Sequence, residues 1–233
     1  MNIKNYWAAT LTAGLFTLAA AVWIGGQFPK DFAEPSADYR DPIIAFEFAE
    51  SPDDLLAIFG PETDPDRAER QNRMDKGHDA DRIFLVTYSL FIASFFLAYR
   101  HEHGQKLMML GIILAVTAAF FDIWENAILR EITHAIDDPH EVVMPMLATL
   151  HTATWIKWFA LGIGSGLAAF TLYRDKRPIL AVLALPGFFL SVPAFIDPRG
   201  YATLFADMIG LWFLVMLIAA GLNYRRASKA NSG

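Results

Sequence analysis

Six long apolar stretches constrain the fold of this 233-residue chain more than any other feature of its sequence. They cover roughly residues 7–26, 83–99, 107–129, 148–173, 178–196 and 204–223. A helix needs about 20 mainly apolar residues to cross a bilayer, and the 55% hydrophobic content is too high for an ordinary soluble domain. We therefore predict an all-α fold, a polytopic membrane helical bundle with six transmembrane helices that forms a single membrane domain over residues 1–233.

Prolines punctuate the fifth apolar stretch at Pro178, Pro186 and Pro193. Proline lacks the backbone N–H that a helix interior uses and its ring clashes with the preceding turn. We therefore expect Pro186 to kink this helix and Pro193 to end it.

Basic residues predict the orientation of the bundle. If the chain crosses the membrane six times, nearly all Lys and Arg residues near the short loops and the termini lie on the same side: Lys4, Arg100, Lys106, Arg174, Lys176, Arg177, Arg225, Arg226 and Lys229. The opposite short loops, 131–147 and 197–203, contain only Arg199. The positive-inside rule then places both termini in the cytoplasm. The first stretch is expected to remain as an anchor, although small residues at 19–21 also fit a cleaved signal peptide.

Residues 27–81 form an acidic outer segment between the first and second spans, with 15 Asp and Glu against 6 Lys and Arg. Within it, 43–59 predicts two short amphipathic helices with a break at Ser51, which would be an N-cap followed by Pro52. These helices are expected to cap the bundle or to act as a lid over an outer cavity. Residues 61–77 fit either a mobile linker or a charged helix that leads into the second span.

Charged side chains inside the third and fourth spans are the most informative polar residues. Asp122, Glu125 and Asn126 share one face of a helix because they are three and four residues apart. Lys157 lies at a matched depth in the next span, roughly 12 Å from the outer side at 1.5 Å per residue. Because an isolated charge at mid-bilayer costs at least about 2.5–3.5 kcal/mol, we expect Lys157 to pair with these acids.

Other polar residues are expected at the same level of the bundle. The predicted ligand-binding set is Asp81, Tyr88, Asp122, Glu125, Asn126, His151, Lys157 and Asp207. Because its acids outnumber its single lysine, either some carboxyls are protonated by burial or the set binds a cation or a protonated amine. It equally fits a purely structural helix clamp, and a proton relay or hydrolytic site also stays open.

The sequence identifies no catalytic residue, no metal site and no cofactor. The chain has no cysteine, which excludes disulfides, thiolate metal sites and cysteine nucleophiles. The loop residues Glu131, His134, His140 and Glu141 match no usual metal-ligand spacing, and a lone His151 within the spans does not suffice for a transmembrane haem. A net charge of −6 without a basic patch argues against nucleic acid as a partner.

The order of the polar elements resembles a family of uncharacterised bacterial membrane proteins. Its pattern is a FELA-like element, a D-x-x-F-x-x-x-Y element, a D-x-x-E-N element and a lone lysine in the fourth span. Here these read 46-FEFA-49, 81-DRIFLVTY-88, 122-DIWEN-126 and Lys157. The resemblance covers roughly residues 43–160 and departs at Phe48, where the pattern has leucine. It implies a shared site in a bacterial inner membrane and carries no activity with it.

Three functions follow as hypotheses. The first is an integral inner-membrane receptor or carrier whose outer cluster binds a small cationic or polar ligand. The second is a non-catalytic accessory or structural subunit of a larger membrane complex. The third is a membrane enzyme that acts on a lipid or another amphiphile. The lipid bilayer is the one partner common to all three.

Overall fold

The computed structural model describes residues 2–34, 39–138 and 140–230, and within these ranges the regular structure is entirely helical. The elements are α1 (Ile3–Ile24), α2 (Pro42–Glu47), α3 (Pro52–Phe59), α4 (Arg67–His103), α5 (Met108–His134), α6 (His140–Arg174), α7 (Pro178–Ala184), α8 (Pro186–Ile196) and α9 (Pro198–Ala230). Six helical segments are long and apolar enough to cross a membrane, with α7 and α8 counted together. The predicted all-helical membrane bundle is therefore confirmed.

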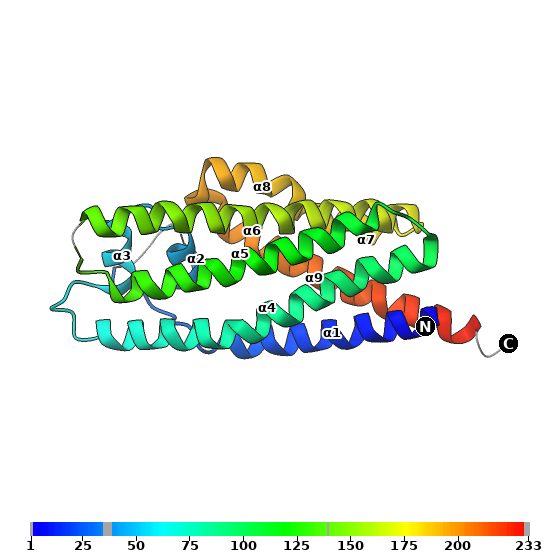
Figure 1. Ribbon diagram of the computed structural model, residues 1–233, viewed down its shortest axis with the longest axis horizontal. Helices are drawn as coiled ribbons and strands as arrows, with labels where there is room; N and C mark the ends of the chain where they lie inside the picture. The colour runs from blue at the N-terminus through cyan, green and yellow to red at the C-terminus, as the bar shows by residue number, and fades with distance from the viewer. Residues whose placement is uncertain (1, 35–38, 139, 231–233) are drawn as a thin grey trace.

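The long helices run roughly along the long axis of the molecule, and the two termini lie at the same end (Figure 1). Helices α2 and α3 lie near the opposite end, which we call the cap end. Helix α1 packs against α4 and α9, and α5 packs between α4 and α6. Helices α7 and α8 cover one side of α6 and α9.

The cap consists of α2 and α3, and its local sequence explains both helices. Ser51 Oγ accepts a hydrogen bond from the Asp54 backbone N–H, and Asp54 accepts one from the Ser51 backbone N–H in return. This reciprocal arrangement satisfies donors that the first turn would leave free. Gly60 ends α3 with φ at +91°, a conformation that glycine adopts without strain.

The cap is packed onto the bundle through its apolar side chains, as the sequence predicted. Phe46, Leu55, Ile58 and Phe59 are at most 2% exposed, whereas Leu56 is 36% exposed. The buried side chains form one core with residues of the long helices, among them Met74, Ile128, Ile132, Leu147 and Leu150. Since this core holds α2 and α3 against α4, α5 and α6, it fixes the position of Glu47 at the end of α2.

Helix α4 begins at Arg67 and runs for 37 residues. Of the two alternatives predicted for residues 61–77, a mobile linker or a charged helix, the part from Arg67 onward is therefore the charged helix. Arg67 and Arg70 are buried at the start of this helix. Arg67 Nη2 lies 2.7 Å from Asp137 Oδ2, and Arg70 donates hydrogen bonds to the Phe59 carbonyl and to Asp64. These contacts connect the charged part of α4 to the cap and to the loop after α5.

The fifth predicted span is divided by Pro186, which begins α8 one residue after Leu185 closes α7. The expectation that Pro193 would end this helix was wrong, because α8 continues to Ile196. Pro193 lies in the last turn, and its carbonyl accepts a hydrogen bond from the Asp197 backbone N–H at 2.9 Å. A proline so close to the end removes one helical hydrogen bond without stopping the helix.

Candidate functional site

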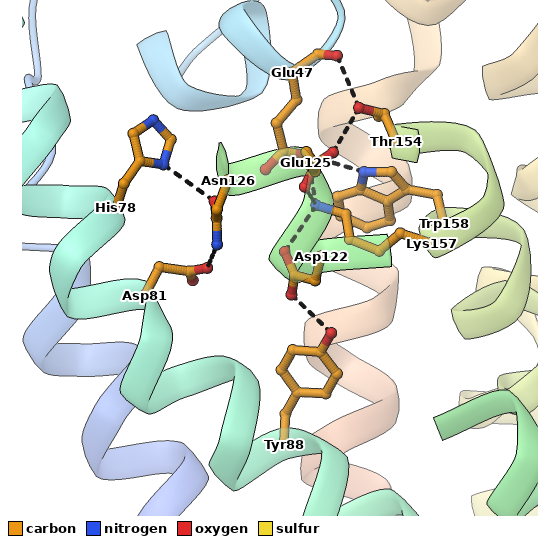
Figure 2. Close-up of polar contacts among 10 residues, drawn as sticks. All are labelled: Glu47, His78, Asp81, Tyr88, Asp122, Glu125, Asn126, Thr154, Lys157 and Trp158. Carbon is orange, nitrogen blue, oxygen red and sulfur yellow. Dashed lines mark hydrogen bonds and ion pairs between the residues drawn. The ribbon is translucent and has the colours of Figure 1, made fainter. Parts of the chain in front are cut away.

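Polar side chains from three long helices and from α2 of the cap meet in one cluster (Figure 2). Helix α4 contributes His78, Asp81 and Tyr88, α5 contributes Asp122, Glu125 and Asn126, α6 contributes Thr154, Lys157 and Trp158, and α2 contributes Glu47. The spacing of three and four residues along α5 and α6 turns each set toward the same side of its helix.

Lys157 is the centre of this cluster and its side chain is only 6% exposed. Its Nζ forms an ion pair with Glu125, lies 3.2 Å from Glu47 Oε2 and lies 3.6 Å from Asp122 Oδ1. The predicted pairing of Lys157 with the α5 acids is therefore present. A buried ammonium surrounded by carboxylates is stabilised by charge-assisted hydrogen bonds that replace its lost hydration.

Glu125 is fully buried, at 0% exposure, and is satisfied on both oxygens. One oxygen pairs with Lys157, and Thr154 Oγ1 lies 2.5 Å from the other. Thr154 itself is fully buried on α6. Glu125, Thr154 and Lys157 therefore form a closed contact between α5 and α6.

Two further hydrogen bonds extend the cluster to α4 and to the cap. The Tyr88 hydroxyl donates to Asp122 Oδ2 at 2.7 Å. The Trp158 indole Nε1 donates to Glu47 Oε2 at 2.9 Å, the same oxygen that faces Lys157. These bonds fix the direction of both carboxylates, because Asp122 has Tyr88 on one oxygen and Lys157 on the other, and Glu47 has Trp158 and Lys157 on the same oxygen.

A second row of polar groups lies beside the lysine cluster and contains no cation. His78 Nδ1 donates to Asn126 Oδ1 at 3.1 Å, and Asn126 Nδ2 donates to Asp81 Oδ2 at 2.5 Å. Among the described residues, no ion pair includes Asp81. His78 is 2% exposed and its Nε2 has no hydrogen-bond partner in the described part of the chain.

A cavity of about 630 Å³ adjoins both rows and lies between α1, α2, α4, α5, α6 and α9. Its charged lining residues are Glu47, Asp81, Asp122, Asp207 and Lys157. Glu47 and Asp122 share Lys157 with Glu125, and Asp207 pairs with Arg40, so Asp81 is the lining carboxylate for which the described residues supply no cation. Such an arrangement favours a positively charged guest, because each added cation would offset an excess of negative charge.

The structure brings together six of the eight residues that the sequence predicted for the site: Asp81, Tyr88, Asp122, Glu125, Asn126 and Lys157. Asp207 also lines the cavity, but its side chain is 50% exposed and forms an ion pair with Arg40. His151 lies elsewhere, with its ring centroid 6.2 Å from that of Trp155 and 6.4 Å from that of Phe195. It therefore packs among aromatic rings between α6 and α8 rather than in the polar cluster.

Sequence reasoning missed Glu47, His78, Thr154 and Trp158 as members of the cluster. Glu47 carried one signal, because it is the acid of the 46-FEFA-49 element and stands between side chains that the cap buries. Thr154 lies three residues before Lys157 and four before Trp158, so the helical period placed it on the turn next to both. His78 precedes the second apolar stretch, where a histidine looks like a solvated residue.

Within the described ranges, no group of three or more His, Asp or Glu side chains converges as a metal site. The ammonium of Lys157 occupies the point toward which Glu47, Asp122 and Glu125 are directed. No protein-family model, no curated protein and no solved structure matches this chain.

Proposed function

We propose that this chain is a multi-pass protein of a bacterial inner membrane that binds a small cationic ligand in the cavity beside Asp81, in the manner of a receptor or carrier. In this proposal the cap end faces outward and both termini are cytoplasmic. The observation that carries it is the position of Asp81. This carboxylate lines the cavity and has an amide as its hydrogen-bond partner, whereas the neighbouring acids share Lys157.

The chemistry of the remaining lining supports a guest of this kind. Tyr88, Asp122 and Asn126 supply hydrogen-bonding groups on the same wall as Asp81. A cation that entered the cavity would meet oriented oxygens in surroundings of low dielectric constant, where charge pairs are stronger than in water. The bonds from Tyr88 and Asn126 hold these oxygens in place before a ligand arrives, which limits the entropy lost on binding.

A binding measurement on the whole protein in lipid nanodiscs tests this proposal. Tetramethylammonium is a suitable first probe because it carries charge without hydrogen-bonding groups. We expect it to raise the thermal unfolding midpoint of the wild type through mass action, and to have little effect on Asp81→Asn. Asp53→Asn is the matched control, since Asp53 is exposed on α3 and does not line the cavity. A wild type that responds to no cation would contradict the proposal.

A structural or accessory role is the second candidate, and one observation favours it. The lysine cluster joins α2, α4, α5 and α6 through contacts that leave Lys157 and Glu125 satisfied without any ligand. A protein whose cluster only holds its helices together would keep its activity, or its place in a larger membrane complex, when Asp81 is replaced. The Asp81→Asn variant therefore separates the two candidates.

An enzyme acting on an amphiphile is less well supported by the side chains present. The hydroxyls of Tyr88 and Thr154 are hydrogen-bonded to Asp122 and Glu125. Thr154 is fully buried and does not line the cavity.

A further inference from the structure

The cavity is long as well as polar, and its length is a separate observation from the charge at its cap end. Its lining extends along α4 from Asp81 to Phe91 and along α9 from Ala206 to Leu217. At 1.5 Å per residue, each of these stretches is roughly 15 Å long. A compact cation held by Asp81 would fill only one end of such a space.

The end of the cavity farthest from the cap is lined by apolar groups. Gly14, Phe91 and Leu217 meet there, since a Cβ atom on Gly14 would lie 2.7 Å from Phe91 Cε2 and 2.8 Å from Leu217 Cδ1. The charged lining residues all lie nearer the cap. Glu47 is on α2, Asp122 on α5 and Lys157 on α6, and Asp81 and Asp207 lie near the cap ends of the lining stretches of α4 and α9. Apolar cavities of this kind accept hydrocarbon and exclude water.

The wall between α1 and α9 is open toward the surroundings of the bundle. Leu18 on α1 and Leu214 on α9 line the cavity and yet are 42% and 44% exposed. Gly210, one turn before Leu214 on α9, also lines the cavity and is exposed, and a Cβ atom added to it would meet no other atom within 4 Å. Helices α1 and α9 run close together near the termini and diverge toward the cap (Figure 1). In a membrane this opening faces lipid.

We propose that the ligand is a single-chain amphiphile with a cationic ammonium head, and that it enters from the bilayer between α1 and α9. The inference rests on the proposed function, because it uses the same site. The head lies against Asp81 and Asp122, and the alkyl chain follows α9 from Gly210 toward Leu217. The polar wall on α4 and α5 recognises the charge, and the apolar wall on α1 and α9 recognises the chain.

A series of probes on the wild type in nanodiscs tests the chain. Tetramethylammonium, hexyltrimethylammonium and dodecyltrimethylammonium share a head and differ in hydrocarbon, and empty nanodiscs correct for partitioning into lipid. We expect the apparent affinity to increase by about tenfold or more from the hexyl to the dodecyl compound. Uncharged dodecyl maltoside should bind far more weakly than dodecyltrimethylammonium, because it cannot pair with Asp81.

Variants of the opening show whether the chain occupies the proposed path. Gly210→Phe should weaken the binding of dodecyltrimethylammonium by about tenfold or more and leave that of tetramethylammonium unchanged. Gly221→Phe is the matched control on α9, since Gly221 does not line the cavity and a Cβ atom there meets only Leu11 Cδ1 at 3.9 Å. Ala21→Phe places the same side chain on the α1 wall and replaces Gly210→Phe if that variant does not fold.

The outcomes separate the two proposals. Affinity that does not depend on chain length, in the wild type and in the Gly210→Phe and Ala21→Phe variants, would overturn the amphiphile while cation binding stands. Failure of all three ammonium compounds to bind would overturn the proposed function as well. Dodecyl binding that survives Asp81→Asn unchanged would show that the head is not where we place it.

Discussion

Lys157 Nζ lies 3.2 Å from Glu47 Oε2, although the two residues are 110 positions apart and Glu47 belongs to a six-residue helix of the cap. The same Glu47 oxygen accepts the hydrogen bond of the Trp158 indole. A charged group on the cap therefore completes the coordination of a charge inside the bundle. The position of the cap and the charge balance of the cluster depend on each other.

This contact predicts that Glu47 couples the cap to the bundle. Glu47→Gln should lower the free energy of unfolding by about 1–3 kcal/mol, because a buried charge-assisted hydrogen bond is weakened. Hydrogen exchange across residues 42–59 should become faster, and the fluorescence of Trp158 should change as its indole loses a carboxylate partner. Glu50→Gln is the matched control, since Glu50 is exposed. Equal exchange rates in both variants would show that packing alone holds the cap.

The proposed topology predicts the side on which each loop lies. Reporter domains fused after Gln105, Asp175 and Ala230 should all be cytoplasmic, and a reporter inserted after Glu62 should be outside. Six spans place the two loops at Gln105 and Asp175 and the C-terminal end on the same side of the membrane. That side carries most of the Lys and Arg residues near the short loops and the termini, which marks it as cytoplasmic. A reporter after Ala230 that shares the side of the Glu62 reporter would contradict six spans.

Asp64 predicts a contribution to stability that depends on pH. The Asp66 backbone N–H donates to Asp64 Oδ1 at 2.8 Å and Arg70 donates to Oδ2 at 3.0 Å, which together hold the pKa of Asp64 below its ordinary value of 3.8. The unfolded chain then takes up this proton first as the pH falls. The stabilisation is complete above pH 3.8 and is lost as the pH falls through the folded-state pKa.

Thermal unfolding as a function of pH tests this linkage. The difference in unfolding midpoint between the wild type and Asp64→Asn should be largest near neutral pH and should shrink below pH 3.8. Asp53→Asn, on the exposed side of α3, is the control for the loss of a surface carboxylate. A difference that is constant with pH would mean that the Asp64→Asn variant loses packing rather than charge.

Much of the fold was predictable because membrane spans leave a strong signal in a sequence. Apolar length identifies each crossing, and the Ser51–Pro52 pair identifies the start of α3. The charged start of α4 was left open, because residues 61–77 resemble a solvated linker in composition. Burial of Arg67 and Arg70 depends on partners at Asp137 and Asp64, which only the folded chain brings near.

The site was predictable where a charge interrupts an apolar run. Asp122, Glu125 and Lys157 stand out because a bilayer does not tolerate them without partners. Glu47 did not stand out, since it is one of 15 acids in residues 27–81 and only the packing of the cap singles it out. His151 was predicted in the polar site but packs against Trp155 and Phe195. Helical periodicity predicts which residues share one face of α6, but it does not predict which neighbouring helix that face contacts.

The ion pair between Lys157 and Glu125 predicts strong coupling between these two residues. Lys157→Met leaves the fully buried Glu125 without its cation and should lower the free energy of unfolding by about 3–5 kcal/mol. Glu125→Gln should also destabilise, because Lys157 then retains fewer negative partners. The double variant Lys157→Met with Glu125→Gln removes both charges, so it should recover most of the stability that either single variant loses.

Equilibrium unfolding in a mild detergent measures all three variants against the wild type, and Lys106→Met supplies a matched control on an exposed lysine. The control should change stability by less than about 1 kcal/mol, as exposed charges generally do. A double variant as unstable as Lys157→Met alone would show that Glu47 and Asp122 also require the ammonium, because these two acids remain in place. A Lys157→Met variant as stable as the control would contradict a structural role for the pair, since no buried carboxylate would then depend on it.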